Sequence, residues 1–290
     1  MVFSPEKWRL IQTPPASGAW NMAVDEAILE SVISDTSPAT LRLYSWSPAC
    51  LSLGYAQPFR DVEQAALKAR GVELVRRPTG GRAILHCDEL TYSVIGCEID
   101  PRLAGGVLES YCVLSLALLE ALHLLGIPAQ ALEKPVSPGT ISENISPAAS
   151  TPKKSGEQNP VCFEVPSNYE ITVDAKKMIG SAQARRKKGV LQHGTLPLKG
   201  DLARIVKVLR FRDAAARERA ASRLLERAVT AEAVVGRIIS WEQAASAFMT
   251  AFSQVLNLEL ESGELSPGEK RRADELVLEK YAHPEWTERV

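Results

Sequence analysis

Residues 169–198 read YEITVDAKKMIGSAQARRKKGVLQHGTLPL, and this stretch has the pattern of three consecutive strands. Polar and apolar side chains alternate over 169–174; 176–184 resembles a partner strand and 189–198 a third strand, with short polar breaks between them. A period of two residues is typical of a strand with one buried face. Breaks this short leave room only for tight turns, so we predict adjacent antiparallel strands in this part of the chain.

The rest of the sequence predicts an α+β architecture around these strands. Further strand patterns occur at 41–46, 51–55, 72–77, 81–86 and 90–99. Helical spacing of apolar side chains occurs at 20–33, 61–71 and 106–125, and again, after capping signatures at Ser240 and Ser266, at 244–256 and up to Tyr281. No regular βαβ rhythm is present, so we predict mixed or antiparallel sheets with flanking helices.

Composition describes an ordinary globular protein. The sequence has 290 residues, 45% hydrophobic and 24% charged, with a net charge of −1. General nucleic-acid binders are strongly basic, so nucleic acid is not an expected partner. No secretory signal and no apolar run of membrane-spanning length stand out, and five cysteines fit reduced thiols. We therefore predict a cytoplasmic protein without a membrane partner.

Domain organisation depends on the stretch from Lys134 to Pro160, which is rich in Ser, Pro, Gly and Asn. Such a composition suits either a loop within one domain or a linker between two. Strands resume soon after it, which favours the loop. We predict one large domain over 1–255 and a C-terminal helical extension over 256–290. In the helix at 20–33, Asp25 and Glu26 are expected in the first turns, where negative charge suits the helix dipole.

The loop Arg76-Arg77-Pro78-Thr79-Gly80-Gly81-Arg82 combines two guanidinium groups with a glycine turn at a strand end. Guanidinium groups and free backbone N–H groups together suit an anion such as a phosphate or a carboxylate. The glycine spacing matches neither a Walker loop nor the G-x-G-x-x-G pattern. A β-hairpin with solvated arginines explains the same residues, so both interpretations stay open.

Cys162 follows the polar stretch at the entrance to a strand, where a thiol can be both fixed and reachable. A nearby cation stabilises a thiolate, and Lys176 and Lys177 on the next strand are candidates for that cation. A buried structural cysteine is the alternative interpretation.

Two further polar groups carry weaker signals. The basic run from Arg185 to Lys188 is typical of a solvated hairpin tip, with contact to an acidic protein as the alternative. His86, Cys87 and Asp88 are too close in sequence to point the same way on a strand, and no second Cys/His pair has ligand spacing. No metal site is predicted.

Several blocks of the sequence together resemble a known superfamily. RRPTGGRAILH, ELTYSV, CFEVPSNYEI, KKMIGSAQ and LQHG are similar to motifs of lipoate and octanoate attachment enzymes, which belong to the biotin–lipoate protein ligase superfamily. The resemblance runs in order from about residue 8 to about residue 250. It implies a fold like those of class II aminoacyl-tRNA synthetases and biotin–lipoate ligases. Within the superfamily, the chain most resembles cysteine-dependent octanoyltransferases, so 1–255 is expected to be the catalytic domain.

The resemblance also assigns roles to residues. Cys162 is expected to carry the acyl group as a thioester, while Lys177 orients the acyl carbonyl and lowers the pKa of the thiol. Cys87 replaces the aspartate that usually follows the motif histidine, which leaves the role of that carboxylate open. The other matched residues are expected to bind substrate: Arg76, Arg77, Thr79, Gly80, Gly81 and His86 on one wall, and Gly180, Ser181, Gln183, His193 and Gly194 on the other.

The resemblance implies a ping-pong reaction with two protein partners. Octanoyl–acyl carrier protein would give its octanoyl group to the thiol. A lysine of the glycine-cleavage H protein, or of another lipoyl domain such as that of an E2 subunit, would then accept it. Thioester exchange retains the energy of the donor bond, so no cofactor is expected.

Three alternatives remain open at this point. An ATP-dependent lipoate–protein ligase would use ATP and Mg²⁺, but ligases tend to have a third glycine at the position of Arg82 and Gly-Asn at the position of Glu89-Leu90. A lipoyl or octanoyl amidotransferase would move the acyl group between lipoyl domains by the same cysteine–lysine chemistry. A non-catalytic lipoyl-domain binder would not need Cys162 and Lys177.

Overall fold

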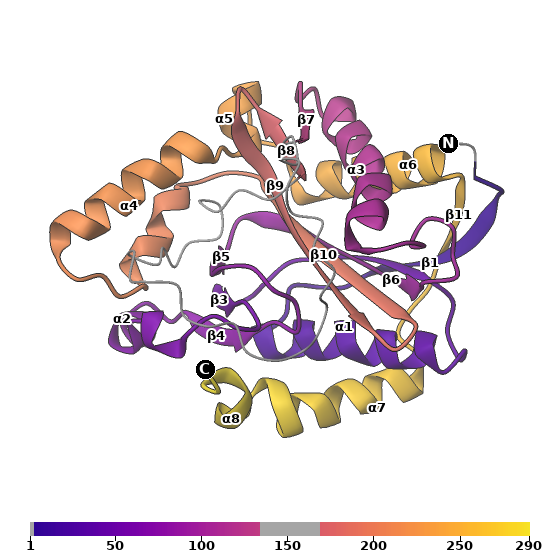
Figure 1. Ribbon diagram of the computed structural model, residues 1–290, viewed down its shortest axis with the longest axis horizontal. Coiled ribbons are helices and arrows are strands. Elements are labelled where there is room, and N and C mark those ends of the chain that lie inside the picture. Colours follow the sequence, from indigo (N-terminus) through magenta and orange to yellow (C-terminus); the bar gives the residue numbers. More distant parts are fainter. Residues whose placement is uncertain (1–2, 134–168) are drawn as a thin grey trace, which may run out of the picture.

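The computed structural model describes residues 3–133 and 169–290 (Figure 1). Cys162 and the whole of the stretch 134–160 lie outside these residues. The two described segments contain all the other residues that were predicted to form the site.

Most of the strands form one large mixed sheet across the molecule (Figure 1). Its strands are β1 (Glu6–Gln12), β2 (Thr40–Tyr44), β6 (Glu89–Cys97), β7 (Gln130–Glu133), β8 (Tyr169–Val173), β9 (Lys176–Arg186), β10 (Gly189–Pro197) and β11 (Leu258–Ser262). Within the described residues the sheet has eight strands in the order β11-β1-β2-β6-β10-β9-β8-β7. β1 is parallel to β2 and β11, and the other neighbours are antiparallel. The predicted run of strands β8, β9 and β10 is confirmed.

A smaller sheet lies beside the large one (Figure 1). Its strands are β3 (Cys50–Leu53), β4 (Glu73–Arg76) and β5 (Ile84–His86), in the order β4-β3-β5. β3 is parallel to β4 and antiparallel to β5. The predicted glycine loop after β4 therefore crosses over β3 to reach β5 instead of forming a simple hairpin.

Helices cover both faces of the large sheet (Figure 1). α3 (Val107–Leu124) and α6 (Trp241–Leu256) pack on one face, with Tyr92 and Val94 of β6. α1 (Gly18–Ile33) covers the other face, with Ile95 of β6, and α7 (Pro267–Leu276) packs on α1. Alternate side chains of a strand point to opposite faces, so one strand supplies both cores. The remaining helices are η1 (Phe59–Asp61), α2 (Gln64–Ala69), η3 (Leu202–Lys207), α4 (Ala214–Arg227), α5 (Ala231–Val235), η4 (Val277–Tyr281) and α8 (Pro284–Thr287).

Helix α1 begins earlier than its sequence pattern indicated. Ser17 is its N-cap, and the Ser17 hydroxyl accepts a hydrogen bond from the backbone N–H of Trp20. Asp25 and Glu26 consequently lie in the middle of the helix, and both are buried. The predicted dipole role for these two carboxylates was wrong, because neither is in the first turn.

Helix α3 tests the prediction that no apolar run is long enough to span a membrane. It has 18 residues with a mean hydropathy of 1.6, which is long and apolar enough to cross a membrane by length and composition. Its residues Val113, Leu114, Ala117 and Leu118 are nevertheless buried in the core that it shares with α6. The expectation that no run reaches this length was wrong. The predicted helix is confirmed, but only one of its faces is buried, since Leu108, Leu116 and Leu124 are exposed.

The C-terminal segment 256–290 contains a strand as well as helices. β11 extends the large sheet beside β1, and α7 packs against α1. The boundary after residue 255 stays a prediction. Strands β1, β7 and β11 were missed in the sequence, and all three lie at or near an edge of the sheet.

Candidate active site

A pocket lies between the large and the small sheet, with about 40 Å³ of space for the centres of water-sized molecules. Aromatic and aliphatic side chains, among them Met22 of α1, line it together with a few polar groups from the two sheets. The lining residues are Met22, Tyr44, Trp46, Arg77, Gly81, Ile84, His86, Thr91, Gly180, Ser181, Ala182, His193, Gly194 and Thr195. We call this the first pocket.

Most of the residues predicted to bind substrate meet at the first pocket. Seven of them line it: Arg77, Gly81, His86, Gly180, Ser181, His193 and Gly194. Thr79 lies directly behind it, with its hydroxyl 2.6 Å from Nε2 of His193. The structure does not bring Arg76, Gly80 or Gln183 into the lining.

Arg76 and Arg77 have opposite orientations because successive residues of a strand face opposite ways. The Arg76 guanidinium donates to the backbone carbonyls of Gly54 (2.8 Å), Gln57 (2.7 Å) and Thr287 (2.7 Å). Burial lowers the pKa of Arg76 to about 10, helped by the positive charges of Arg289 and Arg77. Arg76 therefore anchors helix α8 to the small sheet, and this explains why it is absent from the pocket lining.

Arg77 faces the first pocket but also binds backbone. It donates to the carbonyls of Ser52 (2.8 Å), Gly80 (3.0 Å) and Arg82 (3.0 Å), and to the Ser52 hydroxyl (2.6 Å). Four donated hydrogen bonds fix the shape of the Pro-Thr-Gly-Gly loop. Carbonyl oxygens take up these donors, so the observed geometry differs from the anion site that the sequence pattern suited.

The Pro-Thr-Gly-Gly loop packs unusually close to the end of β3. A Cβ atom placed on Gly54 would lie 1.9 Å from the carbonyl oxygen of Gly81. Gly81 itself has a φ of 92°, which an L side chain rarely adopts. Glycine is therefore required at both positions to seat the loop against the pocket.

Asp25, His193 and Thr79 form one hydrogen-bonded triad, which we call the Asp25 triad. Nδ1 of His193 lies 3.4 Å from Oδ2 of Asp25, and the Thr79 hydroxyl meets Nε2. Burial tends to raise the pKa of Asp25, but Arg42 at 2.7 Å and His193 outweigh it and hold that pKa below its usual value. Burial lowers the pKa of His193 despite Asp25. The neutral imidazole donates to Asp25 from Nδ1 and accepts the Thr79 proton at Nε2.

Glu89, His86 and Ser52 form the second such group, the Glu89 triad. Nδ1 of His86 is bonded to Oε1 of Glu89, and Nε2 lies 2.7 Å from the Ser52 hydroxyl. Because Ser52 accepts from Arg77, its own proton goes to the imidazole. Trp46 stacks on the His86 ring at 3.9 Å between centroids and 11° between planes. His86 therefore has one fixed orientation at the wall of the first pocket.

Ser181 ends a third hydrogen-bonded series. The Gln183 amide donates to Oε1 of Gln192 (3.0 Å), and the Gln192 amide donates to the Tyr92 hydroxyl (3.1 Å). Tyr92 in turn lies 2.7 Å from the Ser181 hydroxyl. The Ser181 hydroxyl is therefore held at the wall of the pocket through Tyr92 and Gln192. Gln183 thus supports the site from behind without lining it.

Lys177 stands at the start of β9 and is largely buried, with 7% of its surface exposed. Its Nζ lies 3.4 Å from Oε1 of Glu170 on β8. Lys177 is not among the lining residues of the first pocket. Its predicted partner Cys162 is outside the described residues, so the structure does not place the two groups relative to each other.

Sequence reasoning missed several residues of this site. Asp25, Ser52, Trp46, Tyr92 and Glu89 were not predicted to take part in it. Glu89 alone carried a local signal, because it follows His86 by three residues and their side chains meet across a turn. The partners of Asp25 come from β2, β6 and β10, and no local spacing indicates them. Among the described residues, no group of three or more His, Cys, Asp and Glu side chains could hold a metal ion.

Comparisons with known proteins indicate the family of this chain. Residues 17–253 match the family described as lipoyl protein ligase A/B catalytic domain. An octanoyltransferase LipM of Kyrpidia tusciae is 39% identical over 285 residues, which cover 98% of this chain and 99% of the relative. An octanoyltransferase LipM of Carboxydothermus hydrogenoformans is 39% identical over 282 residues, with 97% and 98% covered.

Solved structures show the same fold. The chain is similar to a bi-partite lipoate protein ligase of Thermoplasma acidophilum, whose structural analysis includes an E2 lipoyl domain. The TM-score is 0.75 at 23% identity, with 98% of this chain and 96% of that chain covered. A lipoate-protein ligase A bound with ATP gives a TM-score of 0.73 at 24% identity, with 97% and 98% covered. At these identities the likeness concerns the fold. With the family match and the curated relatives, it shows that the chain is an acyltransferase that belongs to the lipoyl protein ligase A/B catalytic domain family.

Proposed function

We propose that the protein is an octanoyltransferase of lipoate biosynthesis. It moves the octanoyl group from octanoyl–acyl carrier protein to a lysine of the glycine-cleavage H protein or another lipoyl domain, through a thioester on Cys162. The full-length similarity to relatives named octanoyltransferase supports octanoyl as the transferred group. We also infer that the reaction needs no cofactor and takes place in the cytoplasm.

The first pocket is the observation that carries this proposal. Met22, Tyr44, Trp46 and Ile84 offer apolar surface to an acyl chain, and each buried methylene contributes about 0.8 kcal/mol. Apart from Thr195, the polar side chains that line the pocket have protein partners among the described residues, as in the Asp25 and Glu89 triads. An uncharged aliphatic chain therefore meets no group whose hydrogen bonds it would break.

The chemistry that we propose has two balanced steps. The Cys162 thiolate attacks the carbonyl of the donor thioester, a new C–S bond forms, and the carrier thiolate leaves. The ε-amine of the acceptor lysine then attacks the enzyme thioester, the C–N bond forms, the C–S bond breaks, and the amine proton passes to the departing Cys162 sulfur. A cation at Lys177 favours the thiolate before the first step and after the second.

Intact mass spectrometry after mixing with octanoyl–acyl carrier protein tests the proposal. We expect one octanoyl adduct on the wild type and on Cys87→Ala, and none on Cys162→Ala. Lys177→Met should slow adduct formation, whereas the matched variant Lys176→Met, next to it on β9, should not. A wild type that forms no adduct but lipoylates H protein when ATP is added would instead be a ligase.

A further inference from the structure

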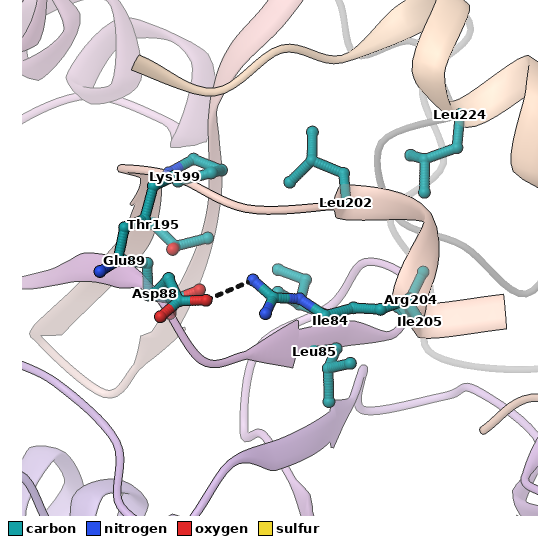
Figure 2. Close-up of a pocket in the computed structure, with 11 residues that line it drawn as sticks. Ile84, Leu85, Asp88, Glu89, Thr195, Lys199, Leu202, Arg204, Ile205 and Leu224 are labelled. Atoms are coloured by element: carbon teal, nitrogen blue, oxygen red, sulfur yellow. Dashed lines mark ion pairs between the residues drawn. The ribbon is translucent and has the colours of Figure 1, made fainter. Parts of the chain in front are cut away.

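A second cavity adjoins the first pocket on the side of η3 and α4 (Figure 2). It lies between the turn that links β5 to β6, the end of β10, and these two helices, with about 40 Å³ of space for the centres of water-sized molecules. Its lining residues are Ile84, Leu85, Asp88, Glu89, Thr195, Pro197, Lys199, Leu202, Arg204, Ile205 and Leu224. Ile84 and Thr195 also line the first pocket, so the two cavities meet at these residues.

Thr195 stands out at this junction. Only 1% of its surface is exposed, and its hydroxyl oxygen has no hydrogen-bond partner in the described parts of the chain. Buried hydroxyl groups nearly always have a partner, so an unpaired one calls for an explanation. A ligand that reaches the junction would supply the missing hydrogen bond.

The walls of the second cavity define the kind of ligand. Leu85, Leu202, Ile205 and Leu224 give it an apolar interior that suits an aliphatic stem. Figure 2 shows Thr195 on the same side as Asp88 and Glu89, away from Leu224. The cavity is thus apolar along one side and polar at the junction with the first pocket.

Charge in the second cavity is nearly balanced. Arg204 closes one edge through an ion pair of 2.7 Å with Asp88, and both side chains are 32% exposed (Figure 2). Lys199 adds a second cation, and Glu89 a second carboxylate that is engaged with His86 and Thr91. A long alkyl chain with an amine at its end fits this lining, and the uncharged amine is the reactive form of a lysine side chain.

We propose that the second cavity receives the acceptor lysine and that the Thr195 hydroxyl binds its ε-amine at the junction with the first pocket. The inference rests on the proposed function, because it names the second substrate of that reaction. The Thr195 hydroxyl oxygen accepts one N–H of the amine and leaves the nitrogen lone pair free to attack the acyl carbonyl. Attack forms the C–N bond and breaks the C–S bond of the enzyme thioester, and the amine proton leaves with the sulfur.

Separate measurement of the two half-reactions tests this assignment. Enzyme and octanoyl–acyl carrier protein give the rate of adduct formation by intact mass. The isolated octanoyl-enzyme mixed with apo H protein, or with N-acetyl-lysine methylamide, gives the rate of transfer. We expect Thr195→Val to slow transfer to both acceptors about 100-fold, the scale of loss for a misplaced reacting group, and to slow adduct formation much less. Thr195→Ser should restore transfer.

A cavity-filling variant gives a second test that does not touch the hydroxyl. Leu202→Trp places a large side chain in the second cavity, and Ala203→Trp adds the same group to η3 outside its lining. We expect only Leu202→Trp to slow transfer, with melting temperatures close to wild type for both. Equal loss in both half-reactions for Thr195→Val would overturn the assignment, since the cavity would then serve the donor. Unchanged transfer would overturn it as well.

Binding of N-acetyl-lysine methylamide to the unacylated enzyme keeps the two proposals distinguishable. Saturation-transfer NMR should show contact between the lysine methylenes and the wild type, and this signal should fall in Leu202→Trp but not in Ala203→Trp. A wild type without an octanoyl adduct but with this binding would refute the proposed function and retain the lysine site. Equal signals from both variants would refute the lysine site.

Discussion

The Asp25 triad and the Glu89 triad have the same chemical order, yet they hold their imidazoles in different ways. Asp25 and His193 are 168 residues apart, whereas Glu89 and His86 are three apart across one turn. Asp25 also balances a fully buried cation, Arg42, while Glu89 meets only the imidazole and the Thr91 hydroxyl among the described side chains. The two walls of the pocket thus have the same arrangement of groups. The Asp25 triad is held by charge pairing between residues distant in sequence, and the Glu89 triad by a local turn.

The two walls of the pocket therefore depend on different interactions for their stability. Removal of one member of a buried ion pair leaves a charge without compensation, which costs more than a lost hydrogen bond between neutral groups. The wall formed by β10 should therefore depend on the integrity of the whole fold. The wall formed by the turn from β5 to β6 should tolerate change more readily.

Asp25→Ala tests the first half of this comparison and should have the largest effect. It leaves the Arg42 guanidinium buried without its carboxylate, so we expect a loss of about 3–5 kcal/mol in the free energy of unfolding. Urea unfolding followed by circular dichroism measures it. Replacement of both residues, Asp25→Leu with Arg42→Met, should lose less than Asp25→Ala alone. A double variant at least as unstable as the single one would contradict the charge argument.

Glu89→Ala tests the second half and should cost less. His86 and Thr91 lose their acceptor, and an unsatisfied neutral group costs about 1–3 kcal/mol. The same urea titration gives the value. A loss equal to that of Asp25→Ala would remove the distinction between the two walls.

Gly54→Ala tests how the Asp25 triad depends on the loop that carries Thr79, because the substitution should displace that loop. The new methyl group collides with the Gly81 carbonyl at 1.9 Å, which should destabilise by about 1–3 kcal/mol and lower octanoyl transfer about 100-fold through misplacement of the loop. Gly80→Ala is the matched control, since a Cβ atom placed there meets no group of the described residues within 4 Å. Both variants are compared by thermal melting and by the adduct assay. Similar losses in the two would contradict the steric explanation.

Acidification should have the smallest effect on stability, and it tests His193 of the Asp25 triad. His193 faces Asp25, Thr79, Arg77 and His86, and its lowered pKa keeps it neutral in the folded protein. Below about pH 6.5 the unfolded chain takes up a proton at this residue and the folded protein does not, so stability falls with pH by up to about 1.4 kcal/mol per unit. Melting temperatures between pH 7 and 5 should fall less steeply for His193→Gln. Identical slopes would show that His193 contributes nothing to this window.

Local patterns predicted the interior strands and helices but not the edges of the sheet. β9 and β10 contain only buried or half-buried residues, so their apolar side chains stand out within a short stretch of sequence. β1 and β11 carry charged residues that pair with one another, as Lys7 does with Glu261 at 2.5 Å. Such strands are stabilised by partners about 250 residues away, and nothing in a short window reveals those partners.

The same limit applies to the site. Thr79, His86 and His193 were predicted because their motifs resemble a family, and the structure places them around one pocket or just behind it. Arg76 belongs to the same motif, but its orientation is determined by strand β4 and by a helix more than 200 residues later. Asp25 was assigned to the wrong role because its partners Arg42 and His193 are distant in sequence. Thr195 shows its significance only as a buried hydroxyl without a partner in the described residues.

The link between Arg76 and helix α8 has a consequence for biosynthesis. Arg76 donates to the carbonyls of Trp286 and Thr287, which a ribosome makes 210 residues after it. A growing polypeptide can form the small sheet before that, but this arginine then lacks two of its acceptors. The contact between the small sheet and α8 therefore forms only after residues 284–287 have been synthesised, which makes it one of the last contacts that the small sheet gains.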